Sequence, residues 1–191
     1  MKINISILGS TGSIGTHTLK LICKRKKLFK IKSLFANKNY KLICSQIKQY
    51  NPSVFLINDF KTFLKVKKKF KNKRIKILNY QSKFTYNLPK SDITVAAIPG
   101  IAGLEPTIQF MKKSKKILIA NKEAVICGWD LIKNIALRKK IKIIPIDSEH
   151  FSIMQLLKEH KLSEIKKIYI TASGGPFLKT NLSKLKKIKP S

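Results

Sequence analysis

Two carboxylates stand close together in a chain that has few of them. Asp147 and Glu149 follow the apolar stretch 141–146, and the 191 residues include 9 acidic against 41 basic side chains. Residues two apart in an extended segment face the same way, so both carboxylates could hold one hard cation such as Mg²⁺ or Mn²⁺ through oxygen. Two protein ligands do not complete such a site. The structural alternative is that Glu149 caps the following helix by binding its amides.

Ser148 and His150, beside these carboxylates, each allow a functional role and a structural one. Ser148 could orient a substrate hydroxyl or cap the same helix. His150 could act as a base, although a side chain that merely lies along the helix is favoured.

A glycine-rich turn near the start of the chain could bind a dinucleotide. Gly9, Gly12 and Gly15 follow the apolar stretch 3–8 and lead into an amphipathic stretch. These glycines would permit a tight turn, a close approach of backbone amides to a pyrophosphate, and close packing of the helix on the sheet. A turn without a ligand is the alternative, because the spacing is G-x-x-G-x-x-G. No Lys-Ser/Thr pair follows, which excludes a P-loop.

The next apolar stretch bears on which dinucleotide would bind. A NAD site usually places an acidic residue about 20 residues past the glycines to bond the ribose 2′-hydroxyl, yet the first carboxylate of this chain is Asp59. The stretch 31–36 ends instead in Asn37, Lys38 and Asn39, which offer amides and a cation where a 2′-phosphate would lie. The sequence therefore favours NADP, unless Lys38 is simply one of many lysines.

Two further turns carry polar groups. Asn121, Lys122 and Glu123 follow the apolar stretch 116–120 and could face a cofactor and substrate. The alternative is a helix start, with Asn121 as N-cap and Glu123 favouring the helix dipole. Ser173 precedes two glycines, a pattern that suits a phosphate or polyol but also a plain turn.

Short apolar runs alternate with amphipathic, lysine-faced stretches, and this alternation predicts an α/β fold with a mostly parallel, doubly wound, Rossmann-like sheet. Strands are expected at 3–8, 31–36, 54–57, 75–78, 93–98, 116–120 and 141–146, and helices near 13–26, 39–49, 59–70, 104–113 and 122–138. Ligands of such sheets bind at the carboxyl ends of the strands. The polar turns at 9–15, 37–39, 121–123 and 147–150 each follow an expected strand and therefore lie at its carboxyl end.

The pattern changes after about residue 150. A helix near 150–160 and a strand at 167–172 are expected, followed by the lysine-rich stretch 178–191. About 40 residues cannot readily bury a core of their own, so the chain is expected to be cut off. We place a dinucleotide-binding domain at 1–146 and the beginning of a second domain at 147–191.

The formal net charge of +32 would ordinarily suggest nucleic acid. Nearly all basic residues are lysines scattered through every segment, and Lys, Ile and Asn share AT-rich codons. Specific nucleic-acid binding is therefore not expected, although weak binding to polyanions at low salt follows from charge alone. Three widely spaced cysteines indicate a reducing cytoplasm. No apolar run is long enough to span a membrane, so no membrane association is expected.

Four motifs, at 9–15, 120–123, 145–150 and 173–177, closely resemble those of the 1-deoxy-D-xylulose 5-phosphate reductoisomerase family. The resemblance implies an NADPH domain followed by the beginning of an α+β catalytic domain. It also implies an enzyme of non-mevalonate isoprenoid biosynthesis that rearranges 1-deoxy-D-xylulose 5-phosphate and reduces it to 2-C-methyl-D-erythritol 4-phosphate. NADPH and Mg²⁺ or Mn²⁺ would be the cofactors, with Co²⁺ as a further option, and the complete protein would be a homodimer.

The resemblance also implies residue roles. Cofactor contacts would come from Thr11, Gly12, Ser13, Ile14, Asn37, Lys38, Asn39, Asn121 and Glu123. Metal ligands would be Asp147 and Glu149, catalytic residues Lys122 and Glu149, and sugar-phosphate contacts Lys122, Ser148, Glu149 and Ser173. Asn37 departs from the family, which has glycine there; Asn tolerates left-handed backbone better than most residues.

The family's lid, its third metal-binding glutamate and its carboxy-terminal helical domain would all lie beyond Ser191. The resemblance therefore leaves three functions to weigh: a reductoisomerase of which this chain is a part, an inactive dinucleotide-binding remnant, and, less favoured, a lysine-rich nucleic-acid binder. The chain alone is expected to be inactive.

Overall fold

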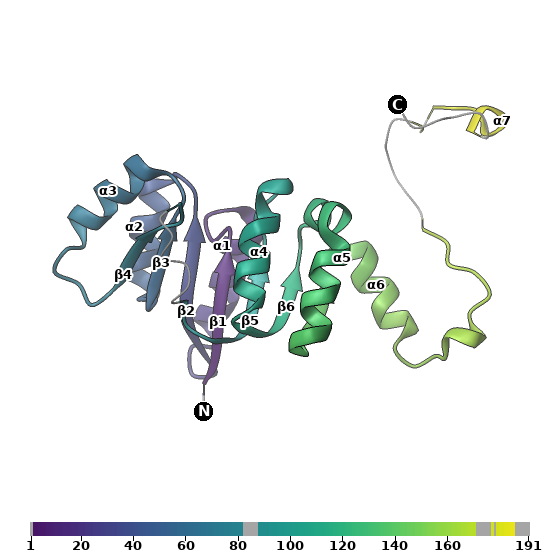
Figure 1. Ribbon diagram of the computed structural model, residues 1–191, viewed down its shortest axis with the longest axis horizontal. Coiled ribbons are helices and arrows are strands. Elements are labelled where there is room, and N and C mark those ends of the chain that lie inside the picture. Colours follow the sequence, from purple (N-terminus) through teal and green to yellow (C-terminus); the bar gives the residue numbers. More distant parts are fainter. Residues whose placement is uncertain (1, 82–87, 171–176, 178, 186–191) are drawn as a thin grey trace. The chain divides into compact units, whose positions relative to one another are not determined.

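The computed structural model describes residues 2–81, 88–170, 177 and 179–185, and the chain divides into two compact units, Met1–Phe151 and Ser152–Ser191. The first unit contains one sheet of seven strands (Figure 1). The strands are β1 (Ile3–Leu8), β2 (Phe29–Ala36), β3 (Val54–Ile57), β4 (Lys76–Asn79), β5 (Ser91–Ala96), β6 (Ser114–Ile119) and β7 (Lys142–Pro145).

The strand order is β4-β3-β2-β1-β5-β6-β7, and every neighbouring pair is parallel. The chain builds the sheet outward from β1 to β4, returns to place β5 on the other side of β1, and then continues outward to β7. The order therefore reverses between β1 and β5. Open α/β sheets bind ligands in the crevice at such a reversal, and the predicted Rossmann-like fold is confirmed.

Helices cover both faces of the sheet. They are α1 (Ser13–Lys24), α2 (Tyr40–Tyr50), α3 (Phe60–Lys69), the short 3-10 helix η2 (Ile101–Gly103), α4 (Leu104–Met111) and α5 (Lys122–Lys139). Leu19, Ile43 and Val66 bring α1, α2 and α3 into one buried cluster. Met111 and Ile132 bring α4 and α5 into a second cluster, and Figure 1 shows these two helices in front of the sheet.

The arrangement of the helices follows from the handedness of the crossovers. Parallel strands joined through a helix connect in a right-handed sense. Strands added in one direction from β1 therefore place their helices on one face, and strands added in the opposite direction place theirs on the other. The same reversal leaves a crevice between the carboxyl ends of β1 and β5.

The helix α6 (Ser148–Leu157) begins in the first unit and ends in the second, which also holds η3 (Leu162–Glu164) and α7 (Leu182–Leu185). Apolar side chains of the second unit are exposed, among them Leu156 at 72% and Tyr169 at 83%. The predicted strand 167–172 is wrong over its described part, because residues 167–170 lie outside any strand. Among the described helices, none has the length and apolar character needed to cross a bilayer.

Candidate cofactor and metal site

A small cavity of about 160 Å³ lies at the reversal point of the sheet, at the carboxyl ends of β1, β5 and β6. Three segments line it: the start of α1, the segment after β5 and the segment after β6. The lining residues are Ile14, Ala97, Ile98, Pro99, Ala120, Asn121 and Glu123. Three of the predicted cofactor residues, Ile14, Asn121 and Glu123, therefore meet at one hollow.

The glycines of the first turn are required by close backbone contacts. Gly9 has φ +77°, and a Cβ there would lie 2.5 Å from the carbonyl oxygen of Ala97. A Cβ on Gly15 would lie 2.2 Å from the carbonyl oxygen of Gly9. Any side chain at either position would push apart the turn after β1 and its neighbours. The predicted packing roles of these two glycines are confirmed.

The amino end of α1 is open to a ligand. Gly12 is its N-cap, with extended backbone, and no side chain of the described residues caps the helix there. Ser13 and Ile14 follow as exposed residues of the first turn, and Thr11 before them is half-buried. Uncapped amides and the positive end of the helix dipole attract anions, so this end suits a pyrophosphate.

The sequence analysis missed the residue that holds this turn. Gln46, on α2, is buried; its Nε2 donates to the Ser10 carbonyl oxygen at 2.8 Å, and its Oε1 accepts from the Ser10 hydroxyl at 2.8 Å. The backbone amides of Gly9 and Ser10 both donate to the carbonyl oxygen of Phe35, at 2.9 Å each. The turn is thus bonded to β2 and α2 before any ligand binds.

The three residues after β2 are all exposed. Asn39 caps α2, its side chain accepting from the Leu42 amide at 3.1 Å. The Asn37 side chain accepts from the Asn58 amide nitrogen at 3.4 Å. Lys38 is not among the residues that line the cavity; it lies at the neighbouring strand end, where an adenine ribose would extend from the turn.

A carboxylate does approach this end of the site. Asp59 follows β3 and caps α3, accepting from the Thr62 amide at 2.7 Å. Hydrogen bonds from the Thr62 side chain and then from its backbone amide lower the pKa of Asp59, and the nearby charges of Lys61 and Lys38 lower it further. Counting along the chain could not reveal this, because Asp59 reaches Lys38 through the pairing of β2 with β3.

Asn121 is 3% exposed and uses its whole side chain within the protein. Its oxygen accepts from the Ala124 amide at 3.0 Å and so caps α5, while its nitrogen donates to the carbonyl oxygens of Ile98 and, at 2.9 Å, Gly100. The predicted N-cap is confirmed. Asn121 therefore shapes the cavity by joining the segments that follow β5 and β6.

The carboxylates after β7 also have partners. One oxygen of Asp147 accepts from the backbone amide of His150 at 3.0 Å and from its ring Nδ1 at 2.7 Å. Asp147 therefore caps α6 through the amide of His150, whereas Glu149, the cap of the structural alternative, binds its own amide. Glu149 also accepts from the Ser148 hydroxyl at 2.9 Å. The His150 side chain, for which the sequence left open a base or a side chain lying along the helix, is hydrogen-bonded to Asp147.

Both carboxylates are easily ionised. Burial raises the pKa of Asp147, but hydrogen bonds from His150 outweigh burial and the net shift is downward. Hydrogen bonds from its own amide and from Ser148 lower the pKa of Glu149, and the charge of Lys122 lowers it further. Both hydrogen bonds from His150 go to one oxygen of Asp147, and ionised carboxylate oxygens are ligands that a hard cation prefers. Within the described ranges, no three His, Cys, Asp or Glu side chains gather into a metal site.

A larger hollow of about 520 Å³ adjoins these groups. Lys122, Asp147 and His150 line one part of it, and the rest is apolar, including Trp129, which is 44% exposed. Lys122 and Asp147 therefore line the same hollow. Ser173, the remaining predicted substrate contact, lies outside the described residues.

Comparison with known proteins gives a consistent match. A family model described as 1-deoxy-D-xylulose 5-phosphate reductoisomerase matches residues 5–128, and one described as the C-terminal domain of that enzyme matches residues 143–191. The chain is 45% identical over 187 residues to the 1-deoxy-D-xylulose 5-phosphate reductoisomerase of Pelagibacter ubique, which covers 96% of this chain and 48% of that protein.

Two solved structures agree with the sequence match. The Zymomonas mobilis reductoisomerase in complex with NADPH superposes with a TM-score of 0.85 at 30% identity, over 98% of this chain and 50% of that one. A DOX-P reductoisomerase in complex with NADPH, fosmidomycin and magnesium superposes with a TM-score of 0.80 at 28% identity, over 98% and 49%. The chain therefore spans about half the length of the relatives it matches.

Proposed function

This chain belongs to the 1-deoxy-D-xylulose 5-phosphate reductoisomerase family, and from that membership we propose that it provides the NADPH-binding part and the start of the catalytic part of such an enzyme. The activity would be the isomerisation of 1-deoxy-D-xylulose 5-phosphate and its NADPH-dependent reduction to 2-C-methyl-D-erythritol 4-phosphate. Residues 1–146 would form the NADPH domain, and 147–191 would begin the catalytic domain.

The cavity at the reversal point of the sheet carries this proposal. The uncapped amino end of α1 lies on one side of it and the segment joined by Asn121 on the other. An anion at the end of α1 would place the rest of a dinucleotide across the carboxyl ends of β1 and β5.

We assign the cofactor contacts accordingly. The backbone amides near Thr11, Gly12, Ser13 and Ile14 would bind the pyrophosphate, and Lys38 would pair with the 2′-phosphate. Asn37 and Asn39 flank Lys38 and would set its backbone, Asn39 through its cap on α2. Glu123, exposed at the mouth of the cavity, would face the nicotinamide end, and Asn121 would position it. NADPH, when bound, supplies the hydride.

Asp147 and Glu149 would hold the divalent cation, which acts as a Lewis acid on the substrate oxygens. Lys122 lies near Glu149 and shares the larger hollow with Asp147. Lys122 would therefore contact the substrate. Its ammonium would compensate the negative charge of the substrate phosphate or of Asp147 and Glu149. Ser148 would orient a substrate hydroxyl, and Ser173 would contact the sugar-phosphate. Further ligands must come from substrate, water and the part of the family that this chain does not span.

Two further proposals concern the whole protein: the family supports the first, and the cysteines support the second. The complete enzyme would be a homodimer. It would work in the cytoplasm, where reduced thiols persist, and Cys23, Cys44 and Cys127 are free.

A charge placed at the end of α1 tests the cofactor site directly. Ser13→Glu would repel a pyrophosphate while favouring the helix dipole, so a loss of binding could not be ascribed to unfolding. We expect NADPH affinity, measured by fluorescence titration, to fall about tenfold or more. The matched variant Ser45→Glu, on exposed α2 surface, should leave it unchanged. Equal losses in both variants would contradict the assignment.

Turnover separates the enzyme from a binding remnant. With 1-deoxy-D-xylulose 5-phosphate, Mn²⁺ and NADPH, the chain joined to the remaining half of the Pelagibacter ubique relative should oxidise NADPH. The chain alone should bind NADPH without oxidising it, because two carboxylates leave most of a hard cation's roughly six oxygen positions open. Glu149→Gln in the joined protein should abolish turnover. A joined protein that binds NADPH but never oxidises it would favour the remnant.

A further inference from the structure

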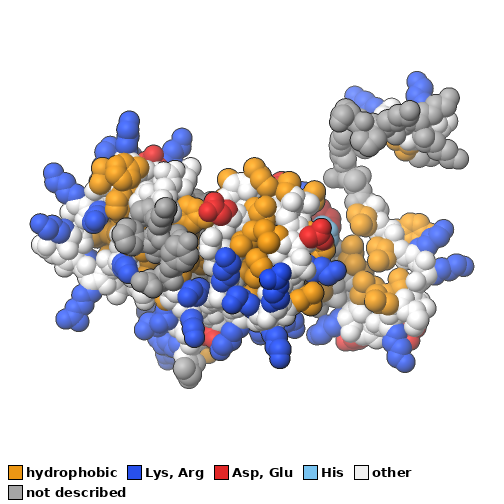
Figure 2. Space-filling view, in the orientation of Figure 1, with side chains coloured by type: hydrophobic (Ala, Val, Ile, Leu, Met, Phe, Trp, Pro, Cys, Tyr) orange, Lys and Arg blue, Asp and Glu red, His pale blue; other side chains and the backbone are white. Residues whose placement is uncertain are grey.

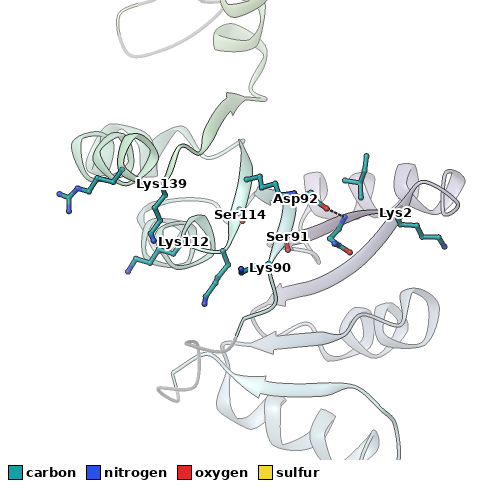
Figure 3. Close-up of a pocket in the computed structure, with 12 residues that line it drawn as sticks. Lys2, Lys90, Ser91, Asp92, Lys112, Ser114 and Lys139 are labelled. Atoms are coloured by element: carbon teal, nitrogen blue, oxygen red, sulfur yellow. Dashed lines mark hydrogen bonds and ion pairs between the residues drawn. The ribbon is translucent and has the colours of Figure 1, made fainter.

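A third hollow lies at the opposite end of the sheet, at the amino ends of β1, β5 and β6, and has a volume of about 870 Å³. Its lining is mostly cationic: Lys90, Lys112, Lys113, Lys115, Arg138 and Lys139, together with Lys2. We call it the cationic hollow. Figure 3 shows Lys90, Lys112 and Lys139 on one side of it, with Asp92 and Lys2 on the other.

The hollow has little negative charge of its own. Among the described residues that line it, Asp92 is the one carboxylate, and its two oxygens are bonded to the Lys115 ammonium at 2.8 Å and the Asn4 amide at 2.9 Å. The carboxyl ends of α4 and α5 carry Lys112 and Lys139 nearby. Each helix end contributes roughly half a negative charge. Asp92 and both helix ends together therefore offset about two of the seven cations, and about five stay uncompensated.

Scattered lysines alone do not account for this concentration. Figure 2 shows basic side chains over most of the visible face of the first unit, with a group of them at the lower end of α4. The other cavities described above are different: as far as the structure describes their linings, the one at the reversal point has no lysine and the one beside Asp147 has Lys122 alone. Cations converge on one concave surface, and that surface lies away from the proposed cofactor site.

We propose that the cationic hollow binds a chain of phosphate groups, carried either by inorganic polyphosphate or by the triphosphate of a nucleotide. Ammonium groups bind phosphate oxygens as point charges, and the volume, equal to about thirty waters, is enough for several linked phosphates. The floor is rigid, since the buried hydroxyl of Ser91 is bonded to that of Ser6 at 2.6 Å and Ser114 bonds the Phe110 carbonyl.

The lining argues for phosphate chains over single-stranded nucleic acid. Proteins that bind single strands stack bases on aromatic side chains, and none of the described residues that line the hollow is aromatic. Its apolar contribution is Ile3. Contacts would therefore be made to phosphate alone.

Calorimetric titration of the full chain with sodium tripolyphosphate tests the proposal. NADPH is present at saturation to block the end of α1, and ionic strength is about 0.15 M to screen diffuse charge. We expect saturable binding to one site. The triple variant Lys90→Ala, Lys112→Ala, Lys139→Ala should weaken it about tenfold or more, with an unchanged circular dichroism spectrum.

A control with the same loss of charge comes from exposed lysines on and after α3, changed together as Lys65→Ala, Lys68→Ala and Lys71→Ala. This control should bind tripolyphosphate as the unchanged chain does. An equal loss in both triple variants would show diffuse attraction and overturn the proposal. Binding that disappears when NADPH is added would place the phosphate at α1 and also overturn it.

Further titrations identify the source of the phosphate chain. ATP and tripolyphosphate of equal affinity, with AMP much weaker, would indicate recognition of the phosphate chain itself. ATP markedly tighter than tripolyphosphate would indicate a nucleotide. An oligothymidylate that binds through the same lysines while tripolyphosphate does not would make the hollow a nucleic-acid surface and overturn the proposal. None of these outcomes depends on the reductoisomerase activity.

Discussion

Lys38 is the residue on which the choice between NADPH and NADH depends. It is exposed, follows β2, and lies close enough to Asp59 for its charge to lower the pKa of that carboxyl. Lys38→Ala should weaken NADPH binding by about 1–3 kcal/mol, the value of a charge-assisted hydrogen bond, and leave NADH unaffected. Fluorescence titration with both cofactors measures the difference. Lys41→Ala, an exposed lysine on α2, is the control, and a parallel loss for NADH would contradict the role.

Gln46 is predicted to be a positioning residue for the glycine turn. Gln46→Leu would leave the buried hydroxyl and carbonyl of Ser10 without their partners, at a cost of about 1–3 kcal/mol per unsatisfied group. Urea unfolding should show the lower stability, and the dissociation constant for NADPH should rise because the turn is released. Ser10→Ala removes only one of the two bonds and should have the smaller effect. Unchanged NADPH affinity in a folded Gln46→Leu variant would make Gln46 structural only.

These residues mark how far the sequence could predict the site. The glycines, Asn121 and the carboxylates were predicted because each belongs to a local pattern whose spacing has a physical meaning. The contact of Gln46 with Ser10 and the approach of Asp59 to Lys38 were not, because each joins residues of different elements that only the folded sheet brings together. Asp147 lies between these cases: its position was predicted, but the only helix cap considered at this turn was Glu149, as an alternative to a metal ligand.

At the scale of elements, Gly103 is a tightly constrained point between β5 and α4. A Cβ there would lie 2.5 Å from the Ile98 carbonyl oxygen and 2.2 Å from the Asn121 side-chain nitrogen. Gly103→Ala should therefore push the segment after β5 away from the start of α5 and lower both stability, by roughly 1–3 kcal/mol, and NADPH affinity. Gly100→Ala meets no atom within 4 Å but has φ +70°, so it reports backbone strain alone. Gly103→Ala should lower the midpoint of thermal unfolding more than Gly100→Ala does. The reverse order would contradict the predicted clash.

The helices and strands themselves were largely predictable, since their periodicity is local. β3 has the expected bounds, 54–57. β5 was expected at 93–98 but is Ser91–Ala96, because the apolar pair Ala97 and Ile98 lines the cavity instead of continuing the strand. The strand expected at 167–172 was wrong in its described part for a different reason: an apolar run forms a strand only when another strand pairs with it, and periodicity cannot supply that neighbour.

At the scale of the molecule, acid should destabilise the fold. Asp59, Asp92, Asp147 and Glu149 all have lowered pKa values, in Asp92 through its bonds to Lys115 and Asn4. A folded pKa below the unfolded one stabilises the protein above the unfolded value, near 4, and the stabilisation is lost as the pH falls through the folded value. The midpoint of thermal unfolding should therefore drop between about pH 5 and pH 3.

Asp92→Asn provides the check on this pH dependence. The variant should be less stable than the unchanged chain at about pH 6, and the difference should shrink toward pH 3 as Asp92 itself becomes protonated. A difference that stays constant with pH would mean that the carboxylate charge contributes nothing.

The pairing of β1 with β5 has a consequence for the order in which the molecule assembles. Contacts across this pair join residues 88 positions apart, such as Asn4 and Asp92, whereas β2 follows β1 closely in the chain. Closing the longer loop costs more entropy, and non-local pairs form late in folding. The crevice between β1 and β5 therefore comes into being only when two separately built halves of the sheet meet. In a stopped-flow refolding experiment, the fluorescence of bound NADPH should rise with the slowest phase, so the cofactor would report the completion of the fold.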